Sequence, residues 1–163
     1  METTPGTKSA AQYSLFNELP LLTTRLVCET RLPFSNRIQV STPEEVVPIL
    51  QDYFRDKDRE EFLIVLLNMA NVIVGLSQIS VGGLAASIVE PRQVFKVAIL
   101  ANAAAIILCH NHPSGNPEPS REDIRITRQL VDAGKLMGIP VHDHLIIAGD
   151  TYTSLAERGL MSP

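Results

Sequence analysis

The sequence predicts an α/β fold in which helices flank a mixed β-sheet. Apolar runs of strand length alternate along the chain with segments whose apolar residues recur at helical spacing. The chain has 163 residues and 45% hydrophobic content, which is ordinary for one globular domain with a sizeable core. We divide it into an N-terminal extension, residues 1–40, which we expect to be partly disordered, and a folded domain, residues 41–163.

The first half of the domain is predicted to contain a helix and two strands. Thr42-Pro43-Glu44-Glu45 has the pattern of a capped helix start with proline in the first turn. The apolar face of this helix consists of Val46, Val47, Ile49, Leu50 and Phe54. Phe62–Leu67 and Val72–Val81 are predicted strands that residues 68–71 join, and Gly82-Gly83 ends the second strand.

The second half is predicted to continue with the same alternation. Pro91 begins a helix that runs to about Ala103, and the apolar run Ala103–Leu108 leads from it into a buried strand. The later elements are a long helix at Ile124–Leu136 and strands at Leu145–Ala148 and Tyr152-Thr153.

Composition indicates a cytoplasmic protein. Met1–Ser14 is polar and lacks the cationic start and apolar centre of a signal peptide. No apolar run reaches the ~18 residues that a membrane helix needs, because Lys96 and Asn102 interrupt the longest candidate. Two cysteines, Cys28 and Cys109, form no disulfide framework, and this usage is typical of a reducing compartment.

Charge gives little support to a nucleic-acid partner. The formal net charge is −4 at pH 7, so the chain as a whole lacks a basic footprint. Arg121, Arg125 and Arg128 recur at helical spacing and could form a local basic patch. A solvated helix face with acidic neighbours explains the same arginines, and we favour it.

The segment from His110 to Asp123 is the most informative part of the chain. Alternate side chains of a strand face the same way, so His110 and His112 can point together at one ion while Cys109 and Asn111 point to the opposite face. The proline-rich residues 113–119 must then turn the chain. Ser120-x-x-Asp123 has the capping-box pattern, which brings Asp123 back towards the strand end.

Two imidazoles and one carboxylate suit zinc, and three protein ligands leave a fourth position for water, as in catalytic zinc sites. Taken singly, each part has a plainer explanation. Ser120 and Asp123 could be a helix cap alone, and a His-x-His pair can lie on a solvated loop. Their combination at this spacing favours the metal site. Cys109 is predicted to be a small core residue rather than a fourth ligand.

A second histidine pair, His142 and His144, follows the long helix. A second metal site is conceivable there, but no third ligand has suitable spacing. We favour Asp143 and His144 as structural groups close to the first site, because a metal-bound histidine needs an outer hydrogen-bond partner.

At these residues the chain resembles a known family. His110-x-His112 with Ser120-x-x-Asp123 matches the JAMM motif of MPN/JAB metalloproteases, and residues 110–123 as a whole resemble the bacterial RadC branch. Further segments that match in the same order are Arg59-Glu60-Glu61-Phe62 with residues 63–68, Pro91-Arg92-Gln93-Val94-Phe95-Lys96, Val141-His142-Asp143-His144 and Ser154-Leu155-Ala156-Glu157-Arg158-Gly159-Leu160. The resemblance covers about residues 40 to 161. It departs at Gln93, where the family usually has glutamate, and in residues 1–40, which contain no recognisable helix-hairpin-helix segment, so we expect a short form.

The resemblance implies a single MPN/JAB domain of the cytidine-deaminase-like type, holding one Zn²⁺ per chain through His110, His112 and Asp123. It further implies hydrolysis of a peptide or isopeptide bond, with Glu60 as general acid and base and Ser120 stabilising the oxyanion. From the residues alone, Glu60 and Glu61 are equal candidates, and both could simply belong to a solvated charged strand start.

Two functions follow as hypotheses. The first is a zinc-dependent metallopeptidase with a peptide or protein substrate and no membrane partner. The second is a RadC-like binding module without catalysis, in DNA repair or in a mobile-element context. The intact ligand set and Glu60 favour the first.

Overall fold

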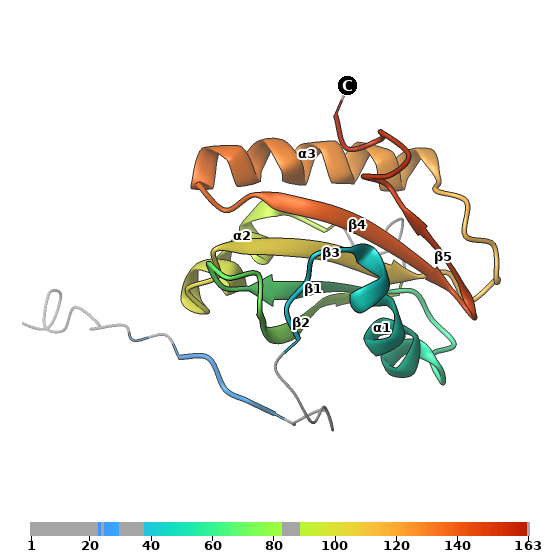
Figure 1. Ribbon diagram of the computed structural model, residues 1–163, viewed down its shortest axis with the longest axis horizontal. Coiled ribbons are helices and arrows are strands. Elements are labelled where there is room, and N and C mark those ends of the chain that lie inside the picture. The colour runs from blue at the N-terminus through green and yellow to red at the C-terminus, as the bar shows by residue number, and fades with distance from the viewer. Residues whose placement is uncertain (1–22, 24, 30–37, 83–88, 163) are drawn as a thin grey trace, which may run out of the picture.

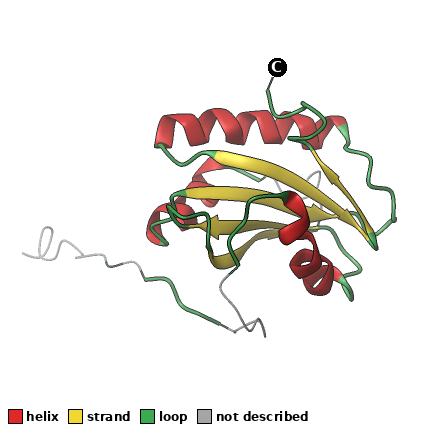
Figure 2. Ribbon diagram, in the orientation of Figure 1, coloured by secondary structure: helices red, strands yellow, loops and turns green. Residues whose placement is uncertain are grey.

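The protein folds around a mixed five-stranded sheet with the strand order β2-β1-β3-β4-β5 (Figures 1 and 2). The computed structural model describes residues 23, 25–29, 38–82 and 89–162. In chain order the elements are a 3-10 turn at Pro43–Glu45, α1 (Val47–Phe54), β1 (Glu61–Leu67), β2 (Ile73–Val81), α2 (Pro91–Leu100), β3 (Ala105–Asn111), α3 (Arg121–Met137), β4 (Val141–Ala148) and β5 (Thr151–Ser154).

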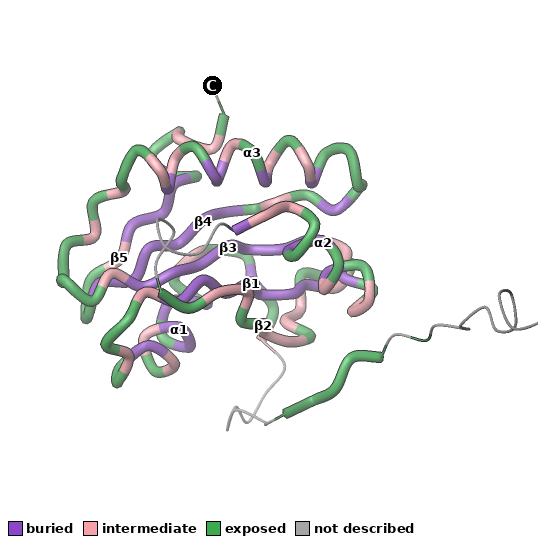
Figure 3. Tube along the Cα trace, turned by 180° about the vertical axis from the view of Figure 1, so that it is seen from behind, coloured by how far each residue is buried: buried purple, intermediate pink, exposed green. Residues whose placement is uncertain are grey.

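The central strands are buried on both faces. Every residue of β1 and of β3 is buried, so their sequences are nearly continuous apolar runs rather than alternating patterns. On one face, α1 packs against the side chains of Leu63, Ile107 and Leu145. On the other face, α2 and α3 pack against Phe62, Ile64, Leu66, Ile106 and Leu108. Figure 3 shows the buried sheet residues between helices whose outer sides are exposed.

The connection from β3 through α3 to β4 determines where a site can form. β3 and β4 are parallel, whereas the other strand pairs are antiparallel. Parallel neighbours need a crossover, and here the crossover is α3. The N-terminus of α3 therefore returns to the carboxyl end of β3, which is where ligands gather in α/β sheets.

The predicted α/β class is confirmed, and the differences are at element ends. α2 ends at Leu100 rather than near Ala103, because the chain turns at Asn102, whose φ is 50°. β4 begins at Val141 rather than Leu145, so the strand includes three polar residues. That start was missed because hydropathy alone cannot show that Asp143 and His144 are buried and hydrogen-bonded.

The expected disorder of Met1–Ser14 and the role of Gly83 lie outside the described residues. The division at residue 40 stays a prediction. In the part of the chain that the structure describes, no helix combines the length and the apolarity required to cross a bilayer.

Candidate metal centre

The site begins where β3 ends. His110 is the penultimate residue of β3 and is 1% exposed, and His112 follows directly after the strand. The two imidazoles point the same way and Cys109 packs in the core on the opposite face, as the alternation predicts; the face of the imidazoles is the one that α2 and α3 cover. The ring of Phe62 stacks on His110 with a centroid distance of 6.1 Å, which shields the imidazole from water.

Asp123 reaches the histidines from the first turn of α3. Ser120 is the N-cap, and its Oγ accepts a hydrogen bond from the Asp123 N–H at 3.1 Å. In return, Asp123 Oδ2 accepts from the Ser120 N–H at 2.6 Å. This capping box orients the carboxylate, so capping the helix and facing the histidines are two roles of the same residue rather than alternatives. Asp123 is buried.

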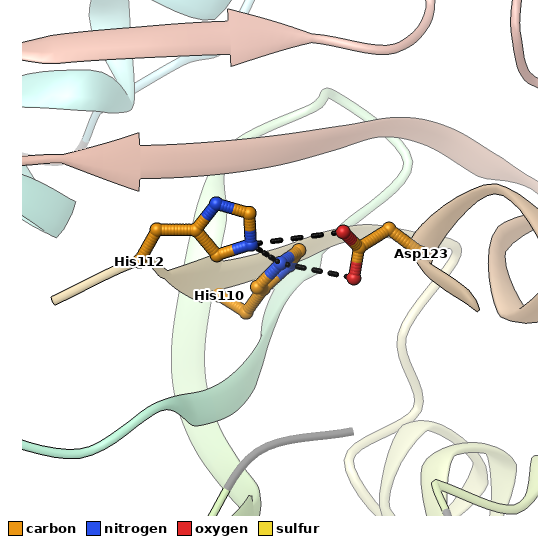
Figure 4. Close-up of side chains that lie close together, drawn as sticks. All are labelled: His110, His112 and Asp123. Atoms are coloured by element: carbon orange, nitrogen blue, oxygen red, sulfur yellow. Dashed lines mark hydrogen bonds and ion pairs between the residues drawn. The ribbon is translucent and has the colours of Figure 1, made fainter. Parts of the chain in front are cut away.

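The three side chains converge (Figure 4). His110 Nε2 lies 3.0 Å from His112 Nε2 and 3.3 Å from Asp123 Oδ1, and His112 Nε2 lies 3.6 Å from Asp123 Oδ2. One ligand atom from each residue lies within 4.8 Å of the other two, a geometry that could hold a metal ion. Among the described residues this is the one such group, and His142 with His144 forms no second.

Hydrogen bonds orient both imidazoles with Nε2 facing inwards. His112 Nδ1 donates to the backbone carbonyl of Asn116 at 2.7 Å, within the turn before α3. His110 Nδ1 lies 2.8 Å from His144 Nε2. When Nδ1 of a neutral imidazole donates a hydrogen bond, Nε2 keeps its lone pair for a metal.

A chain of hydrogen bonds fixes the tautomer of His110. Thr127 Oγ1 donates to the Asp123 carbonyl at 2.5 Å, one helical turn back, so the hydroxyl can only accept from His144 Nδ1, also at 2.5 Å. With its proton on Nδ1, His144 accepts at Nε2 from His110. Burial first, and then the neighbouring His110, hold the pKa of His144 well below its ordinary value, so this imidazole is neutral.

Thr127 was missed by sequence reasoning, although Asp123 and Thr127 share a helix face at i, i+4 spacing.

Asp143 and His144 were expected to be structural groups close to the site, and the structure gives them different positions. His144 contacts the site directly, whereas the Asp143 carboxylate accepts from Ser154 Oγ and from the His144 and Ala156 N–H groups, which ties β4 to the end of β5. His142 is exposed.

The cluster balances its charge internally. Burial alone would raise the pKa of the Asp123 carboxyl, but the His110 and His112 side chains that face it outweigh this effect and hold it well below its usual range. The hydrogen bond to Asp123 raises the pKa of His112, and the charges of Asp123 and Glu60 raise it further. An anionic carboxylate surrounded by imidazoles is the electrostatic setting that a divalent cation can occupy.

The two glutamates lie on opposite faces of the sheet. Glu61 is buried on the face away from the histidines, where its carboxylate accepts from Lys57 at 3.0 Å, Tyr53 Oη at 3.1 Å and Gln78 Nε2 at 2.5 Å. Phe62, the next residue, faces His110. Alternation therefore directs the half-buried Glu60 towards the histidines, and its effect on the pKa of His112 agrees with that direction.

A pocket in the described part of the chain lies away from this cluster. It has a volume of about 610 Å³ and lies on the opposite sheet face, where its lining includes Val40, Ile107, Asp143 and Leu145. It contains none of His110, His112 and Asp123. A metal site needs converging donor atoms more than volume, and the donors converge at the end of β3.

Comparison with known proteins agrees with this geometry. Residues 40–160 match the family model of the RadC-like JAB domain. A UPF0758 protein of Salinibacter ruber is 60% identical over 133 residues, which are 82% of this chain and 57% of the relative. UPF0758 proteins of Desulforamulus reducens and Moorella thermoacetica are 48% and 51% identical over 80% and 77% of this chain, and over 57% and 55% of their own lengths. The chain thus spans little more than half the length of these curated relatives.

Asp123→Asn separates the two roles of Asp123. Asparagine retains capping ability but lacks the anionic charge that a metal ligand provides. We expect helix content, measured by circular dichroism, to be unchanged and Co²⁺ affinity, measured by titration of the visible spectrum, to fall at least about tenfold. Unchanged Co²⁺ affinity would leave Asp123 with the cap role alone.

Thr127→Val tests the hydrogen-bond chain. Valine has nearly the same shape but cannot accept from His144 Nδ1, so the tautomer of His144, and through it that of His110, is no longer fixed. We expect Co²⁺ affinity to fall about 10–100-fold, as for other outer partners of metal-bound histidines. Ile126→Val is the control, since it shortens the neighbouring buried side chain, which takes no part in these hydrogen bonds. Equal losses in the two variants would reduce Thr127 to a packing residue.

Proposed function

The chain belongs to the family of RadC-like JAB domains, and on that premise we propose that it is a zinc-dependent metallohydrolase, which hydrolyses peptide or isopeptide bonds. The observation that carries the proposal is the convergence of His110, His112 and Asp123 at one point, with the face that bears Glu60 beside it. Three ligands on one side of a site, rather than four around it, are typical of catalytic zinc.

The donor set fits zinc. Two nitrogens bound to a tetrahedral zinc ion at ~2.05 Å lie about 3.3 Å apart, and the two Nε2 atoms here are 3.0 Å apart. Imidazole and carboxylate ligands are preferred by zinc over calcium or magnesium, which take mostly oxygen. When bound, zinc supplies Lewis acidity, which lowers the pKa of a coordinated water and polarises a carbonyl group.

Glu60 moves the proton. In amide hydrolysis the oxygen of water bonds to the carbonyl carbon, the C–N bond breaks, and the leaving nitrogen gains a proton. Glu60 accepts that proton from the attacking water and returns it to the nitrogen, so the carboxylate is unchanged at the end. Glu61 cannot replace it, because its carboxylate is engaged by Lys57 and Gln78 on the other face of the sheet.

Ser120 contributes a hydrogen-bond donor. Its Oγ accepts from the Asp123 N–H, and this leaves the hydroxyl hydrogen for a second partner. Ser120 is exposed at the N-terminus of α3, beside the histidines. Its hydroxyl donates to the oxygen that becomes negative when water adds to the carbonyl, and the positive end of the helix dipole acts in the same sense.

No specific observation supports the second hypothesis, a binding module without catalysis. On α3, Arg125 forms an ion pair with Glu122, which agrees with a solvated helix face rather than a nucleic-acid surface. The tests below separate the two functions.

The first test is metal content. We expect purified protein, supplied with Zn²⁺ and then dialysed, to retain close to one zinc per chain by elemental analysis, because the three donors are already oriented. His112→Ala should lose most of it. Wild-type protein that retains no metal would end the proposal.

The second test is Glu60→Gln, which should keep zinc and fold because Glu60 is not a ligand. Hydrolysis of a peptide found by library screening should fall by ~10²–10⁴-fold, the usual contribution of acid–base catalysis. The control is Asp58→Asn, which removes an exposed carboxylate from the same loop. Glu61→Gln is a poor control, because Glu61 is buried in its own polar network. Equal rates in Glu60→Gln and Asp58→Asn, with zinc in both, would favour the binding module.

A further inference from the structure

We propose that Asn111 is a positioning residue that holds Glu60 in a fixed place relative to the metal ligands, an inference that rests on the proposed role of Glu60. Asn111 lies between His110 and His112 in sequence, but its side chain points to the other face of the strand. Its exposed fraction is 4%, so its polar atoms must find partners within the protein.

The partners of Asn111 are the two peptide groups on either side of Glu60. Asn111 Oδ1 accepts from the Glu61 N–H at 2.7 Å, and Asn111 Nδ2 donates to the Arg59 carbonyl at 2.9 Å. We call these two hydrogen bonds the Asn111 bridge. In addition, the Gly82 N–H donates to the Glu60 carbonyl at 2.8 Å, from the end of β2. The backbone at Glu60 is therefore held from both neighbouring strands.

The side chain is needed because the regular ladder between β1 and β3 has ended at this level. The last registered pair is Phe62 with His110, and the bridge lies one residue further along both strands. A side-chain amide offers one donor and one acceptor at the spacing that the two flanking peptide groups require. Aspartate lacks the donor, and an aliphatic residue lacks both.

The bridge fixes the distance between base and metal. Asn111 is the covalent neighbour of both histidines, so a shift of the backbone at Glu60 against His110 and His112 would break two hydrogen bonds, one buried and one partly buried. A polar group that loses its partner inside the protein is unfavourable, so the bridge resists such a shift. Displacement of a catalytic group by ~1 Å can cost about 10²-fold in rate, so a rigid connection at this point has a direct catalytic consequence.

The network around Glu61 fixes the direction in which Glu60 points. The bonds of Glu61 to Lys57, Tyr53 and Gln78 hold that side chain on the opposite face. With the neighbouring residue held there and the flanking peptide groups held by Asn111, backbone alternation directs Glu60 towards the histidines, in agreement with its effect on the pKa of His112. The Asn111 bridge and the hydrogen bonds of Glu61 together determine the face of the sheet towards which Glu60 points.

The test measures how close Glu60 lies to the metal, independently of activity. Wild-type protein and variants carrying a ¹³C label in glutamate carboxyl carbons are loaded with Co²⁺, whose paramagnetic broadening of a nearby carbon falls steeply with distance. The Glu60 signal is assigned by its loss in Glu60→Gln. We expect strong broadening of the Glu60 signal in wild type and clearly weaker broadening in Asn111→Ala. The Co²⁺ affinity of Asn111→Ala should stay within about threefold of the wild-type affinity, since the ligands are untouched.

Asn68→Ala is the matched control. Asn68 Oδ1 accepts from the Ala70 and Val72 N–H groups in the turn after β1, so this variant also loses two side-chain-to-backbone hydrogen bonds, at the opposite end of β1. Asn111→Asp is the second variant, in case Asn111→Ala does not fold, because aspartate keeps the size and the acceptor, although it replaces the donor by a carboxylate oxygen and adds a negative charge. Asn68→Ala should show the same broadening of the Glu60 signal as wild type. The inference would be overturned if the Asn111 variants showed broadening as strong as that of Asn68→Ala, or if wild type showed no broadening of the Glu60 signal.

Activity supplies a second readout. If a library peptide is cleaved, Asn111→Ala should lower kcat by about 10–10²-fold with little change in KM, and should add almost nothing in a Glu60→Gln background, because both changes remove the same proton transfer. Additive losses would contradict the inference. A wild type that cleaves no peptide but shows broadened Glu60 would reject the proposed hydrolase and leave the bridge supported.

Discussion

The structure depends on the need to satisfy buried polar groups at the carboxyl end of β3. His110 lies in the interior, where each ring nitrogen without a partner would cost free energy. The crossover through α3 provides both partners. The start of α3 brings Asp123 beside Nε2, where the two could share a cation, and β4, which the same helix leads into, brings His144 to accept from Nδ1. The fold and the site are thus two results of one connection, because a parallel pair of strands requires a helix that returns to this end of the sheet.

Without a cation, the same cluster must keep its charge balanced by a proton. Asp123 stays anionic, and the pKa of His112 is raised because its imidazolium faces that carboxylate. A raised pKa stabilises the fold fully below the unfolded value of about 6.5 and loses this contribution as pH rises through the folded value. Above the folded pKa of His112, the carboxylate loses this counterion. A divalent cation could take the place of the proton there, which would link metal binding to the stability of the fold.

The parts of the site that follow local rules could be predicted from sequence. His110, His112, Ser120 and Asp123 lie close together in the chain, and strand alternation with a capping box is sufficient to bring them together. The rest depends on register between distant segments. Glu60 and Glu61 could not be separated until the pairing of Phe62 with His110 was known. The contacts of His144 with His110 and of Asn111 with Glu61 likewise join residues 34 and 50 positions apart, and no local pattern encodes them.

The alternation of β3 also determines the direction in which the residue between the two histidines points. A strand that presents His110 and His112 to an ion necessarily presents the residue between them to the opposite face. At this position the hydrogen-bond ladder between β1 and β3 has just ended. The first peptide groups that have no ladder partner on β3 are the two that flank Glu60. An asparagine at this position satisfies them and, because it is part of the same strand, transfers the rigidity of the ligand strand to the glutamate. In this arrangement two residues of the strand face the candidate metal centre, and the residue between them holds the backbone of Glu60, the carboxylate that we propose as the proton carrier.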